Sequence, residues 1–355
     1  MANESGLGVV EVKWFATTNF RLQSGEILPE LTLAYETYGT LAPSGRNAIL
    51  VTHGYTSSQH AAGLDANGLP GWWDGLIGPG KAIDTNKYFV VSSNMLGSSY
   101  GSTAPASINP KTGKPYGPDF PDYTLVDIVT AQRAMLDALG VKHLVAVAGL
   151  SFGGYQAFQW GVTFPDAMRG IVPVVTAPAA TDGERMVADM RARFAEAPGW
   201  HGGHHYGNAT ILGFMTELRV ATLKRYGIEA ELAPRFPDPA KLEAVIHQVA
   251  ETWAKEFDPN SLIALGRARS HYNAEKDFAK VRAKVLYVLS RTDRLFPPSI
   301  APEVMAKLKA AGVDATYFEI DSDKGHLSSG TDWQKWDRVL REFLKRLDPV
   351  GERAR

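Results

Sequence analysis

The stretch Gly149-Leu150-Ser151-Phe152-Gly153-Gly154 decides the fold of this 355-residue chain. It directly follows the run from His143 to Ala148, which is short and rich in Val and Leu and therefore predicts a strand buried on both faces. The segment from Tyr155 to Phe164 that follows is predicted to be a helix. A strand, then G-x-S-x-G, then a helix is typical of a nucleophile elbow, a tight turn that lifts a serine hydroxyl out of a sheet. Glycine neighbours suit such a turn because they carry no Cβ.

Strand-like and helix-like runs alternate along most of the chain, which favours a mostly parallel sheet flanked by helices. Thr124 and Asp127 have capping-box spacing at the start of one helix, and Gly140 is expected to end it. Together with the elbow, the alternation predicts an α/β-hydrolase fold with an inserted helical lid. The clearest predicted strands are 31–37, 48–52, 88–92, 143–148, 170–175, 285–289 and 316–320.

The stretch 181–273 differs from the rest because it is rich in helix-forming sequence and offers no convincing strand. We interpret it as a helical lid inserted into a core domain made of residues 1–180 and 274–355. A lid over the carboxyl ends of the strands would shape the pocket and exclude water. The alternative is a helical insertion without a role at the site.

Composition narrows the class of protein. The chain is 45% hydrophobic and 21% charged, with a formal net charge of -1, so nothing indicates a nucleic-acid partner. It contains no cysteine, which excludes disulfides, thiolate metal sites and a cysteine nucleophile. The N-terminal segment resembles no secretory signal and no apolar run is long enough to span a bilayer, so we expect a cytoplasmic protein that has no membrane partner.

The serine needs a base and an acid that follow it in the chain, in the order Ser, Asp or Glu, His. Asp293 follows the predicted strand 285–289, and His326 follows the last predicted strand. We therefore predict that His326 takes the proton of Ser151 while Asp293 orients the imidazole. Asp321 and Asp323 are rival acids, but they lie too near His326 in the chain to occupy the strand-end loop that the acid needs.

An oxyanion hole is expected beside the nucleophile. One donor should be the backbone N–H of Phe152, and the second should come from the loop after the strand 48–52, where Tyr55 is the candidate. Gly54 would let this loop approach the substrate. His53 is expected to be structural, because the chain order assigns the base to His326.

The segment Trp200-His-Gly-Gly-His-His-Tyr206 carries three histidines, a residue type that often binds metals. No carboxylate lies within the segment, and a serine mechanism requires no metal. We therefore expect no metal site, and place these residues at the lid surface or pocket lining. No nucleotide-cofactor motif is present either.

On longer motifs the chain resembles the homoserine O-acetyltransferase family of α/β-hydrolase-fold proteins. The matching stretches include Leu33-Ala-Tyr-Glu-Thr-Tyr-Gly-Thr-Leu41, His60-Ala-Ala-Gly63, Ser93-Asn-Met-Leu-Gly97, Trp200-His-Gly-Gly203 and Arg291-Thr-Asp-Arg-Leu-Phe-Pro297. The resemblance implies a Ser-Asp-His enzyme that uses an acyl-coenzyme A donor and a hydroxyl acceptor. It also implies a homodimer joined through the lid, and it places the same roles on Ser151, Asp293, His326 and Tyr55.

Departures from the family pattern fall near the site. The family usually has His-Asp at the catalytic histidine, where the acid helps to hold the amine of homoserine, and this chain has His326-Leu327. The lid motif Gly-Gly-Asp-Tyr is here Gly202-Gly-His-His-Tyr206. We expect Gly54, Leu327 and Tyr206 to contact the small-molecule acyl substrate. An apolar Leu327 cannot pair with an ammonium group, so a serine hydrolase of a small ester or amide without a cofactor is expected. The alternative is an O-acyltransferase with acyl-coenzyme A as co-substrate.

Overall fold

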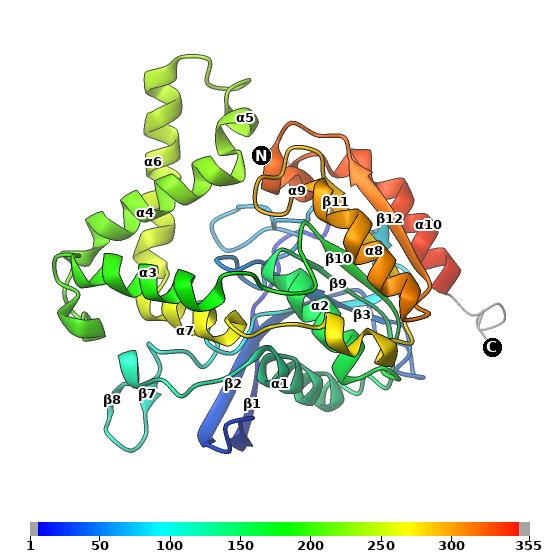
Figure 1. Ribbon diagram of the computed structural model, residues 1–355, viewed down its shortest axis with the longest axis horizontal. Coiled ribbons are helices and arrows are strands. Elements are labelled where there is room, and N and C mark those ends of the chain that lie inside the picture. The colour runs from blue at the N-terminus through cyan, green and yellow to red at the C-terminus, as the bar shows by residue number, and fades with distance from the viewer. Residues whose placement is uncertain (1–5, 348–355) are drawn as a thin grey trace.

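Figure 1 shows a computed structural model of the protein, which describes residues 6–347. Residues 1–5 and 348–355 lie outside the described part. The first five of these begin the N-terminal segment that was compared with a secretory signal. The centre is an eight-stranded sheet with the order β1-β2-β6-β3-β9-β10-β11-β12. Its strands are β1 (Lys13–Arg21), β2 (Ile27–Tyr38), β3 (Ala48–Thr52), β6 (Phe89–Ser93), β9 (Leu144–Leu150), β10 (Met168–Val174), β11 (Lys284–Ser290) and β12 (Ala315–Ile320).

Six neighbouring strands, from β6 to β12, pair in parallel, and β2 and β1 extend the sheet antiparallel at one edge. The carboxyl ends of the parallel strands therefore lie at one edge of the sheet, where α/β folds place their sites. Two small two-stranded sheets accompany the main one: β4 (Ile77–Gly78) with β5 (Ile83–Asp84), and β7 (Ile108–Asn109) with β8 (Lys114–Pro115). This architecture confirms the predicted α/β-hydrolase fold.

All seven predicted strands are present, with ends shifted by a few residues. The strand β1 was not predicted, because it lies at the edge of the sheet, where most of its residues are exposed and its sequence lacks an apolar run. Similarly, the helix after the elbow begins at Phe152, three residues before the predicted start, as α2 (Phe152–Thr163). Short strands and helix ends carry little periodic signal, so these differences are of the expected kind.

Alternating side chains of the strands separate two apolar layers. On β11, Val285, Tyr287 and Leu289 belong to one layer, with α1 (Leu125–Ala138), α2 and α8 (Ala301–Ala310). Leu286 and Val288 belong to the other, with α10 (Asp337–Leu347). The helices therefore cover both faces, as a parallel sheet requires. The short α9 (Ser328–Thr331) lies on the loop after β12.

Both ends of the helix α1 have the features predicted from the sequence. The carboxylate of Asp127 accepts the backbone N–H of Thr124 at 2.7 Å, which satisfies a free donor at the helix start. Gly140 follows the end of the helix with a φ of 81°, a left-handed value that glycine adopts without strain.

Between residues 181 and 273 the structure contains helices and no strand. These are α3 (Gly183–Ala195), α4 (Ile211–Tyr226), α5 (Ile228–Leu232), α6 (Pro239–Glu256) and α7 (Pro259–Arg269). They project from the sheet as a separate layer, drawn in green and yellow in Figure 1. A bridge between Ala179 and Asn273 closes the base of the insertion. Within residues 6–347, no helix combines the length and the apolar character needed to cross a bilayer.

Candidate active site

Ser151 lies in the turn between β9 and α2 with a strained backbone. Its φ is 55° and its ψ is -119°, values that non-glycine residues adopt rarely and at a cost. The conformation is held by its neighbours, because the Ser151 N–H donates to the Val174 carbonyl at 2.8 Å. In turn, Thr176 Oγ1 donates to the Ser151 carbonyl at 2.7 Å. This is the geometry expected of a nucleophile elbow.

The glycines around Ser151 are required by close packing against β3. A Cβ added at Gly149 would lie 2.1 Å from Thr52 Oγ1, and one added at Gly153 would lie 2.1 Å from the Thr52 carbonyl oxygen. Thr52 Oγ1 also donates to the Gly153 carbonyl at 2.9 Å. The elbow is therefore locked to the end of the neighbouring strand.

His326 and Asp293 form a buried pair at the same edge of the sheet. His326 Nδ1 lies 2.8 Å from Asp293 Oδ2, and the two residues are 5% and 2% exposed. The other carboxylate oxygen accepts the backbone N–H of Leu295 at 2.8 Å, which fixes the acid. The pair leaves Nε2 of the imidazole as the nitrogen available to a serine hydroxyl. In contrast, the rival acids Asp321 and Asp323 form ion pairs with Arg291 at the surface.

A chain of aromatic rings connects the predicted site residues, although they come from four separate parts of the chain. The centroid distances are 5.5 Å for Tyr55 to Phe152, 5.8 Å for Phe152 to Tyr155, 6.0 Å for Tyr155 to Phe296 and 5.8 Å for Phe296 to His326. The oxyanion loop, the elbow helix and the histidine loop are thus linked by continuous contacts between side chains.

The loop expected to supply the second oxyanion donor lies against the serine. A Cβ added at Gly54 would be 3.7 Å from the Cβ of Ser151, so the backbone passes close to the nucleophile. The side chain of Tyr55 points to the insertion, where its hydroxyl donates to the Leu262 carbonyl of α7. Burial raises the pKa of this hydroxyl, so it remains neutral. The proposed role of Tyr55 depends on its backbone N–H, as does that of Phe152.

His53 is fully buried beneath this loop, where it is not expected to act as the base. Its Nδ1 lies 2.8 Å from the Gly54 carbonyl oxygen and its Nε2 lies 2.8 Å from Asn94 Oδ1. Burial lowers the pKa of His53 to about 4, although both hydrogen bonds act in the opposite direction. An imidazole buried beneath the loop and held by these two neighbours supports the structural role that we expected.

Two residues of the insertion also reach this region and were not predicted from the sequence. Arg219 on α4 donates to Thr56 Oγ1 of the oxyanion loop at 2.7 Å, and its guanidinium carbon lies 4.7 Å from the Trp253 ring centroid. Its Nε is buried without a hydrogen-bond partner, and the described residues place no carboxylate within ion-pair distance. At the end of α4, the Tyr226 ring contacts the His326 ring with centroids 4.9 Å apart.

The two remaining predicted contact residues differ in their surroundings. Leu327 is half-buried directly after the histidine, and its N–H donates to the Lys324 carbonyl at 3.2 Å. Tyr206 lies in a polar cluster instead, where its hydroxyl donates to Asp258 at 3.0 Å and accepts from Asn260 at 3.1 Å. Substrate contact by either residue stays a prediction.

The histidines of the 200–206 segment do not converge on one point. His205 stacks on Trp200 and lies 3.3 Å from Asp258, a carboxylate that comes from a distant part of the chain, whereas His201 contacts Asn208. Within the described part of the chain, no group of three or more potential ligands is arranged to hold a metal ion.

Comparison with known proteins agrees with the fold. The alpha/beta hydrolase fold family matches residues 48–332. The homoserine O-acetyltransferase of Symbiobacterium thermophilum is 38% identical over 92% of both chains, and that of Moorella thermoacetica is 37% identical over 97% of this chain and 98% of its own.

Solved structures of two kinds are similar to nearly the whole chain. The homoserine O-acetyltransferase of Bacillus anthracis superimposes with a TM-score of 0.86 at 28% identity, over 95% of this chain and 98% of its own. Esterase E22 superimposes with a TM-score of 0.85 at 29% identity, over 94% of this chain and 100% of its own, and an L374D mutant of E22 gives the same values except for 99% coverage.

The fold and these relatives define an α/β-hydrolase-fold enzyme, either an acyltransferase or a hydrolase. Within that fold, the chain belongs to the homoserine O-acetyltransferase family.

Proposed function

We propose that this enzyme is an O-acyltransferase that moves an acyl group from an acyl-coenzyme A to a hydroxyl acceptor through an acyl-serine at Ser151. The observation that carries the proposal is the strained serine at a strand end, beside a buried His326–Asp293 pair at 2.8 Å. Identities of 37% and 38% with homoserine O-acetyltransferases over nearly the whole chain favour transfer over hydrolysis. The serine hydrolase that we expected from the sequence becomes the second candidate.

In the proposed mechanism His326 takes the proton of Ser151 as the serine oxygen attacks the thioester carbonyl. The backbone N–H groups of Tyr55 and Phe152 stabilise the oxyanion that forms. The coenzyme A thiol leaves with the proton from His326. The acceptor hydroxyl then gives its proton to His326 and attacks the acyl-serine, and that proton finally returns to Ser151. Asp293 stabilises the imidazolium at each stage.

The charges beside the site indicate what kind of acceptor fits. Arg219 is partly buried, carries a guanidinium nitrogen without a partner, and contacts Thr56 of the oxyanion loop and the Trp253 ring. A carboxylate on the substrate would pair with this cation. At position 327 an apolar leucine cannot compensate an ammonium group. We therefore propose an acceptor that has a carboxylate and no amine, that is, a hydroxy acid.

Hydrolysis is the second candidate, and two observations favour it. Leu327 cannot pair with the amine of an amino-acid acceptor. Esterase E22 resembles this chain over the whole length of E22. Without a bound acceptor, water would deacylate the acyl-serine.

One experiment separates these possibilities. The protein is incubated with acetyl-coenzyme A alone, with homoserine, and with 4-hydroxybutyrate, which differs from homoserine by the missing amine. We expect release of free coenzyme A that depends on 4-hydroxybutyrate and is several times faster than with homoserine. Release without any acceptor, together with rapid cleavage of simple aryl esters, would favour the hydrolase. In either case a Leu327→Asp variant should improve relative use of homoserine, because the new carboxylate can pair with its amine.

The remaining proposals concern the assembly and its location. We propose a homodimer joined through the helical insertion, which is supported by the family resemblance, and a cytoplasmic enzyme that has small-molecule substrates.

A further inference from the structure

The loop that carries His326 is in close contact with the end of α4. Tyr226 is the last residue of that helix, and Gly227 follows with a φ of 97°. A Cβ added at Gly227 would lie 2.9 Å from the Lys324 carbonyl oxygen, and one added at Gly325 would lie 3.0 Å from the Tyr226 carbonyl oxygen. The two backbones therefore touch through two glycines, one on each side, directly before the histidine.

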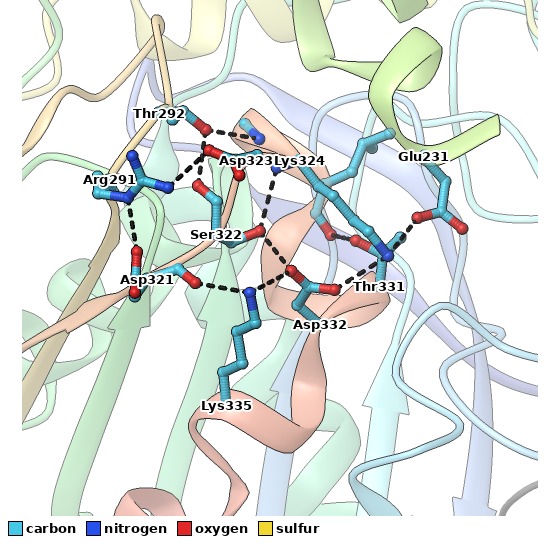
Figure 2. Close-up of polar contacts among 12 residues, drawn as sticks. Glu231, Arg291, Thr292, Asp321, Ser322, Asp323, Lys324, Thr331, Asp332 and Lys335 are labelled. Atoms are coloured by element: carbon cyan, nitrogen blue, oxygen red, sulfur yellow. Dashed lines mark hydrogen bonds and ion pairs between the residues drawn. The ribbon is translucent and has the colours of Figure 1, made fainter. Parts of the chain in front are cut away.

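A lysine ties the same two segments together (Figure 2). Lys324 Nζ lies 2.8 Å from Glu231 Oε2 on α5 of the insertion and 2.9 Å from Asp332 Oδ1 beside α9 of the core. Partial burial acts to lower the pKa of Lys324, but its bonds to the two carboxylates raise it overall, so the lysine is charged. One cation thus bridges the insertion and the histidine loop.

Asp332 is a firm anchor on the core side of this bridge (Figure 2). Its Oδ2 accepts from Ser322 Oγ at 2.6 Å and lies 3.1 Å from Lys335 Nζ. The same Ser322 Oγ accepts the backbone N–H of Lys324 at 3.1 Å. The side chain and the backbone of Lys324 are therefore both fixed to the core, and the ion pair with Glu231 connects this side chain to the insertion.

We propose that Lys324 and Glu231 are positioning residues for the catalytic histidine. Their ion pair docks the α4–α5 turn on the histidine loop, and this docking holds the Tyr226 ring against the His326 imidazole, with centroids 4.9 Å apart. The contact restricts the ring to the orientation in which it exchanges a proton with the serine. This inference rests on the acyl-serine chemistry proposed for Ser151.

An exposed ion pair would have little effect, since such pairs contribute little to stability. This pair differs because both side chains are mostly buried, with 27% exposure for Lys324 and 22% for Glu231, and because it lies two residues from the histidine. Its loss should therefore affect proton transfer more than folding.

The test uses Glu231→Gln and Lys324→Met, with Lys324→Arg as the conservative variant. Glu229→Gln is the matched control, since Glu229 lies exposed on the same short helix. For each variant we would measure the rate of covalent labelling by a fluorophosphonate probe, kcat and KM for p-nitrophenyl acetate, and the midpoint of thermal unfolding. Labelling and kcat should fall about tenfold in Glu231→Gln and Lys324→Met, because a small misplacement of a reacting group is costly. We expect KM to change little, Lys324→Arg to recover most of the rate, and the control to match the parent.

Labelling at the parent rate in Glu231→Gln and Lys324→Met would overturn the inference. So would a loss of rate that is fully explained by the unfolded fraction at the assay temperature. Ser151→Ala distinguishes this failure from failure of the proposed chemistry. If Ser151→Ala abolishes labelling while Glu231→Gln leaves it unchanged, the nucleophile stands and the positioning role is wrong. If Ser151→Ala is still labelled, the acyl-serine proposal itself is wrong.

Discussion

Ser151 is the residue on which the proposed chemistry depends. Substitutions of Ser151 and of its proposed acid Asp293 test this chemistry directly. We expect Ser151→Ala to abolish labelling by a fluorophosphonate probe. Asp293→Asn should retain the fold but lower kcat by about 10³-fold or more, because the imidazole loses the charge that orients and stabilises it. Asp323→Asn is a suitable control, since that acid pairs with Arg291 at the surface. Normal turnover in Asp293→Asn would disprove the assigned acid.

A second prediction at this scale concerns His53 and pH. Burial lowers its pKa to about 4, whereas a histidine in the unfolded chain titrates near ~6.5. The unfolded state therefore binds the proton more readily below that value. The contribution of His53 to stability is present above about pH 6.5 and declines as the pH falls toward about 4, by about 1.4 kcal/mol per pH unit.

Urea unfolding of the parent and of His53→Gln at several pH values measures this contribution. The free energies of unfolding of the two proteins should converge as the pH falls through that window. The comparison is needed because His60 has the opposite sign: burial acts to lower its pKa, but bonds to Glu36 raise it overall. Parallel curves for the two proteins would contradict the prediction.

At the scale of elements, two glycines in helices should respond oppositely to alanine. A Cβ at Gly153 in α2 would lie 2.1 Å from the Thr52 carbonyl oxygen, so Gly153→Ala should destabilise the protein by about 1–3 kcal/mol through overpacking. Gly213 in α4 is exposed with nothing within 4 Å of an added Cβ. Gly213→Ala should therefore stabilise the protein by about 1 kcal/mol through helix propensity. Urea unfolding checks both, and equal effects of the two substitutions would contradict the packing argument.

The elements that the sequence predicted well are those with strong local signals. The strands β3, β9 and β11 are largely apolar and lie between turns, so the oxyanion loop, the elbow and the acid were predicted at their ends from chain order. The base was predicted in the same way at the end of β12. The stretch 181–273 was predicted to be helical because it is rich in helix-forming sequence and offers no convincing strand.

Contacts between the insertion and the core were not predictable. Helical periodicity indicates which face of α4 is buried, but it does not indicate what that face meets. Arg219 reaches Thr56, 163 residues earlier in the chain, and Tyr226 reaches His326. No local pattern distinguishes these two side chains from other arginines and tyrosines of the segment.

For the whole molecule, we predict a homodimer in solution through the insertion. The helices α4, α5 and α6 have a small apolar core of their own, which includes Val220, Leu223 and Ile246, so this part can extend from the sheet and still keep its shape. Sedimentation velocity at micromolar concentration should give a mass twice that of the 38.6 kDa chain. A single species at the mass of one chain would contradict the proposal.

The backbone strain at Ser151 implies a trade between activity and durability. A left-handed φ of 55° is unfavourable for serine and is tolerated by glycine. The enzyme should therefore become more robust when it is made inactive in one particular way. We expect Ser151→Gly to raise the free energy of unfolding by about 1 kcal/mol, because the strained position relaxes. Ser151→Ala keeps the strain and should not share this gain. Both proteins are inactive, so the difference between their free energies of unfolding, measured by urea unfolding, gives the stability that the strained serine costs the enzyme.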